Sequence, residues 1–331
     1  MDNIQQTPFV RELASSDKRV RDKALESLTL FIKSRRDLQL VELLKIWKGL
    51  FFCFYHSDRP LTQQSLARSL SYTLVPSLPP QTLQPFLRAF WITMTRDFHS
   101  LDRLRLDKYL YLIRCYVGVA FETLLKRGLE QSQTQKKQEK QRQEKSKKGT
   151  KENGKLNLGK RKRDAAQEKD DDEGKNYDPT IWNELDTYLT MLESGPFAPL
   201  NFDPDENDTH EFADRSVLMA KGPDGLRYHL LDIWLDEIEK VATITESDEE
   251  KGDEEQTTNK LKDGIPMELL LRPIERLKEK SLTKTVRKRA TEVLEDERLV
   301  EWGVRERRKE GDEEDEDEEE EGEEEWGGFD D

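Results

Sequence analysis

Apolar residues recur every three or four positions along most of residues 7–127, which is the spacing of one face of an α-helix. The segment has no sustained two-residue alternation and no Asn-Gly or Asp-Gly turn between β-branched runs, so strands are not expected there. Polar breaks that offer Ser or Asp as helix caps fall at 15–17, 35–37, 56–60, 76–80 and 99–102. Because short turns make consecutive helices antiparallel neighbours, the pattern predicts stacked helical hairpins.

The stretch LVELLKIWKGLFFCFY, residues 40–55, is apolar around most of a helical wheel. A helix of this kind is buried on several sides, as an inner helix of a stack would be. The alternative is an exposed aromatic platform for a nucleotide or cofactor, but such platforms usually interleave aromatics with Gly or Arg on strands. We therefore predict that Trp47, Phe51 and Phe54 lie between helix pairs.

Two distant segments resemble each other. DKRVRDKALESL (17–28) aligns without gaps on TKTVRKRATEVL (283–294), and the shared spacing V-R-x-x-A-x-x-x-L puts Val, Ala and Leu on one helical stripe. The small Ala falls where a second helix must approach closely. The spacing resembles the second helix of a HEAT repeat, although any amphipathic helix can match it by chance. We predict an all-α, HEAT-like helical-repeat solenoid.

Beyond residue 127 the pattern changes. Residues 128–176 contain three leucines as their large apolar residues, too few to offset the entropy of ordering, so we expect a disordered basic linker. Helical periodicity returns over 177–303, where Pro273 is expected to kink or split one helix and an acidic loop is expected at 246–263. The near-continuous acidic run in 304–331 predicts a disordered tail.

Charge is unevenly distributed along the 331 residues, whose formal net charge is −15. Counted by segment, the net charge is +8 for 1–127, +5 for 128–176, −15 for 177–303 and −13 for 304–331. This polarity suggests an adaptor that meets polyanions at one end and basic proteins at the other. Solvated helix faces with a solubilising tail would give the same counts. The sequence predicts no membrane span and no secretory signal.

Residues that could carry catalysis are sparse. Cys53 and Cys115 each lie in an apolar helical context, which favours buried free thiols in a reducing compartment. The four histidines occur singly, and no metal-binding, phosphate-binding or nucleophile motif is present. We therefore expect no catalytic site, no metal site and no cofactor. The enzymatic alternative is a metal-dependent nuclease, which would need carboxylates fixed on rigid elements.

The linker carries a basic pattern of the bipartite kind that nuclear import receptors read. A pair of lysines is followed, after an eleven-residue spacer, by four more basic residues. These residues are Lys147, Lys148, Lys160, Arg161, Lys162 and Arg163. Such clusters can also be solubilising charge or can hold RNA phosphates without sequence preference. We predict a nuclear protein that is bound by an import receptor.

Three blocks resemble the nucleolar ribosomal RNA processing protein 1 family: FVRELASSDKRVRDKALESLTLFI, LLKIWKGLFFCFYHSDRPLTQQSLA and FLRAFWITMTRDFHSLDRLRLDKYLYLIR. The resemblance covers most of 7–127, and W-K-G-L-F and D-R-L-R-L-D-K-Y are its most specific motifs. It fades in the linker and is loose over 177–243 and 264–303. It implies a nucleolar, non-enzymatic assembly factor of the large ribosomal subunit, bound to precursor particles and required for precursor rRNA processing.

The resemblance further implies other assembly factors, ribosomal proteins and rRNA as partners, and no membrane. The alternative from another class is a HEAT-type nuclear transport or chromatin adaptor. Basic residues in and around D-R-L-R-L-D-K-Y are the candidate contacts to a partner or to rRNA, because arginine pairs with phosphate or carboxylate. They are Arg96, Arg103, Arg105, Lys108 and Arg114. The bland interpretation is a solvated face with a weak Arg103–Asp107 pair.

Overall fold

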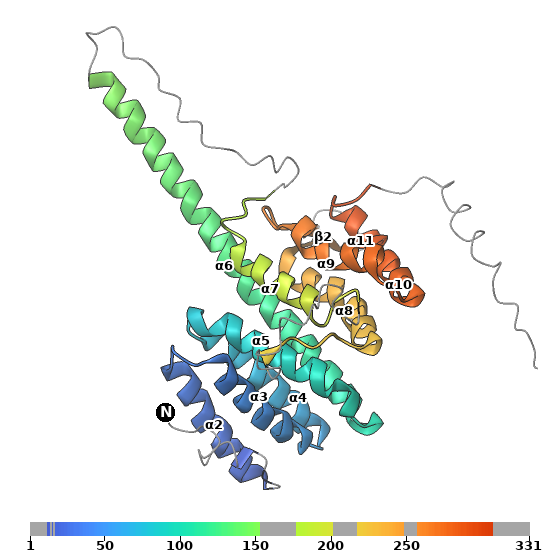
Figure 1. Ribbon diagram of the computed structural model, residues 1–331. Helices are drawn as coiled ribbons and strands as arrows, with labels where there is room; N and C mark the ends of the chain where they lie inside the picture. Colours follow the sequence, from blue (N-terminus) through green and yellow to red (C-terminus); the bar gives the residue numbers. More distant parts are fainter. Residues whose placement is uncertain are drawn as a thin grey trace, which may run out of the picture.

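The computed structural model describes residues 12–13, 15, 17–152, 177–200, 217–247 and 257–306. They form a stack of helices from which one long helix projects (Figure 1). The α-helices are α2 (Lys18–Ser34), α3 (Leu40–Tyr55), α4 (Pro60–Arg68), α5 (Pro80–Asp97), α6 (Arg103–Glu152), α7 (Asn183–Ser194), α8 (Asp224–Ala242), α9 (Met267–Lys280), α10 (Lys284–Leu294) and α11 (Glu297–Glu301). Short η elements lie at Ser69–Thr73 (η2), Val75–Ser77 (η3) and Phe98–Ser100 (η4).

From α3 to α10 the helices alternate between two layers. In one layer α3 packs on α5, α5 on α7 and α7 on α9, while in the other α4 packs on α6, α6 on α8 and α8 on α10. Each helix therefore packs on the second helix after it, as in a stack of helical hairpins. The all-α solenoid is confirmed, and the predicted breaks between the first helices coincide with the ends of α2 to α6. Equivalence of the pairs to HEAT repeats stays a prediction.

The two segments that resemble each other form α2 and α10, and both use the same side-chain contact before the helix. Arg21 Nη1 donates to the backbone oxygen of Ser15 at 2.9 Å, and Arg287 Nη1 donates to that of Ser281 at 3.0 Å. The serines and arginines occupy matching positions of the alignment. The aligned alanines are buried in both helices, at Ala24 and Ala290. The sequence similarity thus extends to the local structure.

The aromatic stretch in α3 is interior, as predicted. Trp47 and Phe54 are fully buried, and Phe51 is 5% exposed. The Trp47 ring lies edge-on to Phe90, with ring centroids 4.9 Å apart, and its Nε1 donates to the backbone oxygen of Phe86 at 3.2 Å. These partners come from α5, so α3 contributes to the core shared by successive helix pairs.

Helix α6 differs from the prediction that helical structure ends by residue 127 and a disordered linker follows. Between residues 112 and 121 nearly every α6 side chain is buried, because α4 and α8 pack on this part of α6. The helix then continues to Glu152, so the predicted boundary at 127 falls inside it. Gln, Glu, Lys and Arg are strong helix formers, and an existing helix propagates through them. The lack of apolar residues therefore indicates a lack of core contact here, not a lack of helix.

The predicted amino- and carboxy-terminal halves share one hydrophobic core, which runs from Leu13 to Trp302. Ion pairs join successive helices within each layer around it. Arg114 on α6 contacts Glu237 of α8 at 2.6 Å, and Glu237 is nearly fully buried. Arg272 of α9 contacts Glu193 of α7 at 2.7 Å. Buried carboxylates are tolerated only when paired, so the Arg114–Glu237 contact connects the two halves specifically, while the Arg272–Glu193 contact lies within the carboxy-terminal half.

One local prediction needs correction, and of the two alternatives given for Pro273 only the split is excluded. The acidic loop expected at 246–263 includes parts of an antiparallel hairpin, with β1 at Thr243–Ser247 and β2 at Thr257–Leu261. Threonine and isoleucine in these segments favour strands, and the acidic run between them hid that signal. Helix α9 is a single helix with Pro273 inside it, so the segment is not split.

The first prediction concerns the core. Replacing Phe51 by Ala should lower the free energy of unfolding by about 3–5 kcal/mol, since the cavity cannot collapse around the packed Tyr109 ring. Chemical denaturation measures this quantity. Phe52→Ala is the matched control, because Phe52 is 39% exposed and its loss should cost no more than about 1 kcal/mol. Equal losses in the two variants would contradict the interior assignment.

The second prediction concerns Gly128, at the point where α7 approaches α6. A Cβ at this position would lie 2.1 Å from Cζ3 of the buried Trp182 ring. Gly128→Ala should therefore destabilise by about 1–3 kcal/mol, although alanine is the better helix former. Gly225→Ala is the control, since its Cβ would meet nothing closer than 3.8 Å. Thermal unfolding of Gly225→Ala should show no loss, and a stable Gly128→Ala would refute the close packing.

The third prediction concerns pH. His229 on α8 lies 2.9 Å from the backbone oxygen of Leu110, and burial lowers its pKa below the usual 6.5. Because the unfolded chain then takes up the proton at higher pH than the folded chain, stability is complete above about pH 6.5 and falls as the pH drops. His229→Gln should make the free energy of unfolding depend less steeply on pH between 7.5 and 5.5. An unchanged slope would contradict this.

Candidate functional site

The amino-terminal end of α6, which carries D-R-L-R-L-D-K-Y, is anchored to the end of α3. Asp102 accepts from the backbone nitrogen of Arg105 at 3.0 Å and from its Nη1 at 2.6 Å. This hydrogen bond from Arg105 is the main reason why the pKa of Asp102 is lowered. The guanidinium of Arg105 also lies 4.2 Å from the Tyr55 ring centroid, a cation–π contact. Arg105 therefore serves first to hold the start of α6.

Lys108 is directed inwards. It is 7% exposed, and its Nζ donates to the backbone oxygens of Tyr55 at 2.8 Å and Ser57 at 3.0 Å. A lysine in this position satisfies carbonyls at the end of α3 that have no partner within the helix. Burial lowers the pKa of Lys108, and Asp58 at 3.7 Å opposes that shift. Our expectation that Lys108 belongs to an exposed basic face needs correction.

Arg114 is only partly exposed, at 35% of its side chain, and is engaged by carboxylates of α8. Its Nε contacts Glu237 at 2.6 Å and its Nη2 contacts Asp236 at 2.9 Å. Arg103 and Arg114 are eleven residues apart and so share one side of α6, but α8 covers this side at the level of Arg114. The sequence could not reveal that covering helix, because it lies more than a hundred positions away. The structure therefore does not bring Arg114 into a common surface with Arg103.

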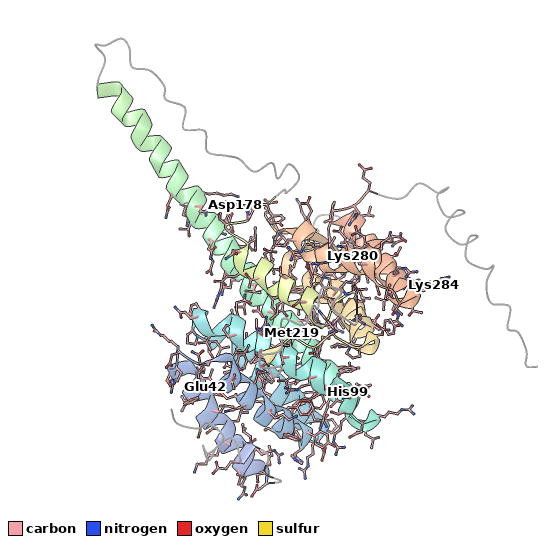
Figure 2. All side chains as sticks on the ribbon, viewed as in Figure 1. Glu42, His99, Asp178, Met219, Lys280 and Lys284 are labelled. Carbon is pink, nitrogen blue, oxygen red and sulfur yellow. The ribbon has the colours of Figure 1, made fainter. Side chains whose placement is uncertain are left out.

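The residues that remain accessible lie where α5 meets α6. Arg96 keeps 40% of its side chain exposed beside Asp97, and Arg103 is exposed. Figure 2 places His99 at the same turn. Leu104 is 91% exposed, and sequence reasoning missed it. Its exposure could have been found from the sequence, because Leu104 lies on a different side of the helix from the apolar stripe that contains Leu106. We call Arg96, His99, Arg103 and Leu104 the α5–α6 corner.

The six residues of the predicted import signal fall in two places. Lys147 and Lys148 lie in the last part of α6. The cluster from Lys160 to Arg163 lies outside the described residues. The import prediction is therefore unchanged by the structure.

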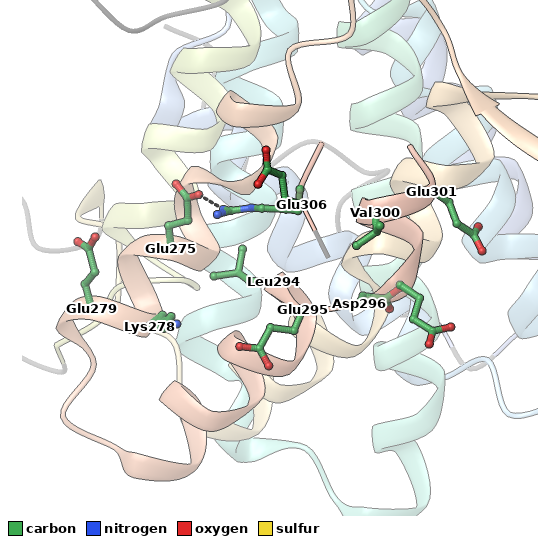
Figure 3. A pocket seen from close by; sticks show the side chains of 11 residues that line it. Glu275, Lys278, Glu279, Leu294, Glu295, Asp296, Val300, Glu301 and Glu306 are labelled. Atoms are coloured by element: carbon green, nitrogen blue, oxygen red, sulfur yellow. Dashed lines mark hydrogen bonds and ion pairs between the residues drawn. The ribbon is translucent and has the colours of Figure 1, made fainter. Parts of the chain in front are cut away.

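The surface formed by the described residues includes two sizeable grooves. One, of about 890 Å³, lies among α9, α10 and α11, and is lined mainly by carboxylates such as Glu279 and Glu301, with Glu275 paired to Arg305 (Figure 3). The other, of about 770 Å³, lies between α2 and α4, where Leu30 is 70% exposed and Leu61 is 81% exposed.

Among the described residues, no cluster of His, Cys, Asp and Glu has the arrangement of a metal site, and no helix has the length and hydrophobicity to cross a membrane. Cys53 and Cys115 are buried and free, as expected. Burial raises the pKa of the Cys53 thiol to about 11, which keeps it protonated and unreactive.

Comparison with known proteins gives relatives for part of the chain. Ribosomal RNA processing protein 1 homolog B of Homo sapiens is 43% identical over 131 residues, which are 38% of this chain and 17% of that protein. The Mus musculus protein of the same name is 42% identical over 132 residues, 38% of this chain and 18% of that protein. A homolog from Dictyostelium discoideum is 27% identical over 125 residues, 38% of this chain and 25% of that protein.

The aligned region thus corresponds to less than a fifth of the two mammalian relatives. A family profile reaches further along the chain. The profile described as nucleolar protein, Nop52, matches residues 4–140 and 210–327, well over half of the sequence. The matched ranges include the α5–α6 corner and all of α8 to α11. The chain therefore belongs to the Nop52 family of nucleolar proteins, which confirms the predicted family and its nuclear and nucleolar localisation.

Proposed function

We propose that this protein is a non-enzymatic scaffold that joins precursor particles of the large ribosomal subunit and is required there for rRNA processing. Its relatives are named for ribosomal RNA processing, and its family for the nucleolus. In this proposal the chain holds other assembly factors and ribosomal proteins in register and performs no chemical step. An import receptor delivers it to the nucleus.

The observation that carries the proposal is the α5–α6 corner. An almost fully exposed leucine beside an exposed arginine lies within the most family-specific motif, at the anchored start of α6. Arginine is enriched at protein interfaces, and a partner that covers the exposed leucine beside it would gain the free energy of burying its apolar surface. Anchoring through Asp102 and Arg105 positions the corner before any partner binds, which lowers the entropic cost of association.

The corner also fits rRNA, because Arg96 and Arg103 could pair with phosphate as well as with carboxylate. A nuclear transport or chromatin adaptor is the competing function. The choice between the scaffold and this competing function is decided by the particles with which the protein sediments. A scaffold of precursor particles sediments with them, whereas a transport or chromatin adaptor does not.

The fourth prediction tests the corner. Arg96→Glu combined with Arg103→Glu should release the tagged full chain from large-subunit precursors in sucrose gradients of nucleolar extract. Its melting temperature should change little, because exposed charges contribute about 0–1 kcal/mol each. Arg105 is left intact because it holds α6 to α3. Arg19→Glu with Arg36→Glu, two exposed arginines in and just after α2, matches the charge change and should stay particle-bound.

Wild-type protein that never sediments with large-subunit precursors would refute the scaffold function itself. A folded corner variant that stays bound as well as the control would show that the corner is solvent-exposed helix without a partner.

A further inference from the structure

The last part of α6, residues 130–152, projects from the body of the protein (Figure 1). We call it the α6 arm. The contacts with the body that the structure describes lie just before it: Arg127 pairs with Glu184 at 3.1 Å, the Trp182 ring packs against Gly128, and Leu129 contacts the core. Residues 133–138 are all exposed. The arm is therefore a helix that is fixed at its root and solvated along its described side chains.

The composition of the arm is unusual for a helix. Residues 130–152 contain no aliphatic or aromatic residue, and they carry eight Lys and Arg against four Asp and Glu. A helix that is polar all round has no face to bury, so packing against the body cannot explain it. At 1.5 Å per residue it extends about 35 Å from its root. This is a basic rod of roughly the length of one turn of a nucleic-acid duplex.

We propose that the α6 arm binds the phosphate backbone of double-helical RNA. A protein groove recognises a helix through apolar anchors at i, i+3, i+4 and i+7, and the arm has none. Single-stranded RNA is bound mainly by aromatic side chains on which bases stack, and these are also absent. Phosphate recognition requires only cations placed along the duplex, since release of counterions supplies the free energy.

This inference rests on the proposed function in one respect, because a precursor particle supplies the RNA duplex. It differs from the corner in its chemistry and its place in the fold. The corner offers a leucine and arginines on the body, whereas the arm offers charge distributed along about 35 Å of helix that projects from the body. The two can therefore be tested separately.

The fifth prediction neutralises the arm in the full chain by changing four cations to Gln, which preserves helix propensity. The positions are Lys136, Lys137, Lys140 and Arg142. Fluorescence anisotropy with a 24-base-pair RNA duplex, roughly two turns, should show at least a tenfold loss of affinity at about 100 mM salt. The log–log dependence on salt should flatten by about 0.9 for each phosphate contact removed. Circular dichroism verifies that helicity is retained.

The matched control changes four exposed cations on the body to Gln, with the same loss of net charge. They are Lys23, Lys33, Arg36 and Lys280. This variant should keep most of its affinity for the duplex. The inference is overturned if the arm variant binds the duplex as tightly as wild type, if the control loses as much, or if the arm-dependent binding is stronger for a single strand of the same sequence.

Sedimentation of the arm variant separates this inference from the proposed function. Failure of the wild-type chain to join precursor particles refutes the scaffold function, whatever the RNA measurements give. An arm variant that binds the RNA duplex normally but leaves the particles would show that the arm contacts an acidic protein, and would overturn the assignment to RNA. Loss of duplex binding in the arm variant alone supports it.

Discussion

The burial of α6 between α4 and α8 is the constraint on which the two-layer stack depends. Close approach is possible because Gly118 leaves room for the ends of Tyr72 and Glu237, which would lie 2.4 and 2.6 Å from any Cβ there. The carboxylate of Glu237 enters this dry interface because Arg114 and Lys240 pair with it. Loss of the partner of such a buried charge typically costs about 3–5 kcal/mol. The close packing of α6 against α8 thus requires both the small residue Gly118 and the Arg114–Glu237 ion pair.

Helix boundaries in the amino-terminal region could be predicted because they are determined locally. Pro60 and Pro80 start α4 and α5, and Asp17 accepts from the backbone nitrogen of Arg19 at the start of α2. Each boundary depends on residues within one turn of it. The burial of α3 could be predicted too, since an almost wholly apolar helix has no other stable environment in water.

The inward orientation of Lys108, the partners of Arg114 and the length of α6 could not be predicted, because they depend on long-range contacts or on competing signals. Lys108 and Arg114 looked like surface cations, and their true partners lie about 50 and 120 positions away. The low hydrophobicity of the α6 arm predicts disorder. Its helix propensity nevertheless allows the existing helix α6 to continue through it. At the site, the eleven-residue spacing of Arg103 and Arg114 places both on one side of α6, but the helix that covers part of this side is not visible in the sequence.

The length of α6 has a geometric consequence for assembly. One helix of 50 residues, about 75 Å, joins the α5–α6 corner at its start to the arm at its end, so the separation of the two surfaces is set by hydrogen-bonded backbone rather than by a flexible linker. A rigid connection gives a high effective concentration only to partners whose own sites have the same spacing. If both surfaces bind, the fixed length of α6 selects particles in which the protein site and the RNA site are already separated by the distance between the corner and the arm.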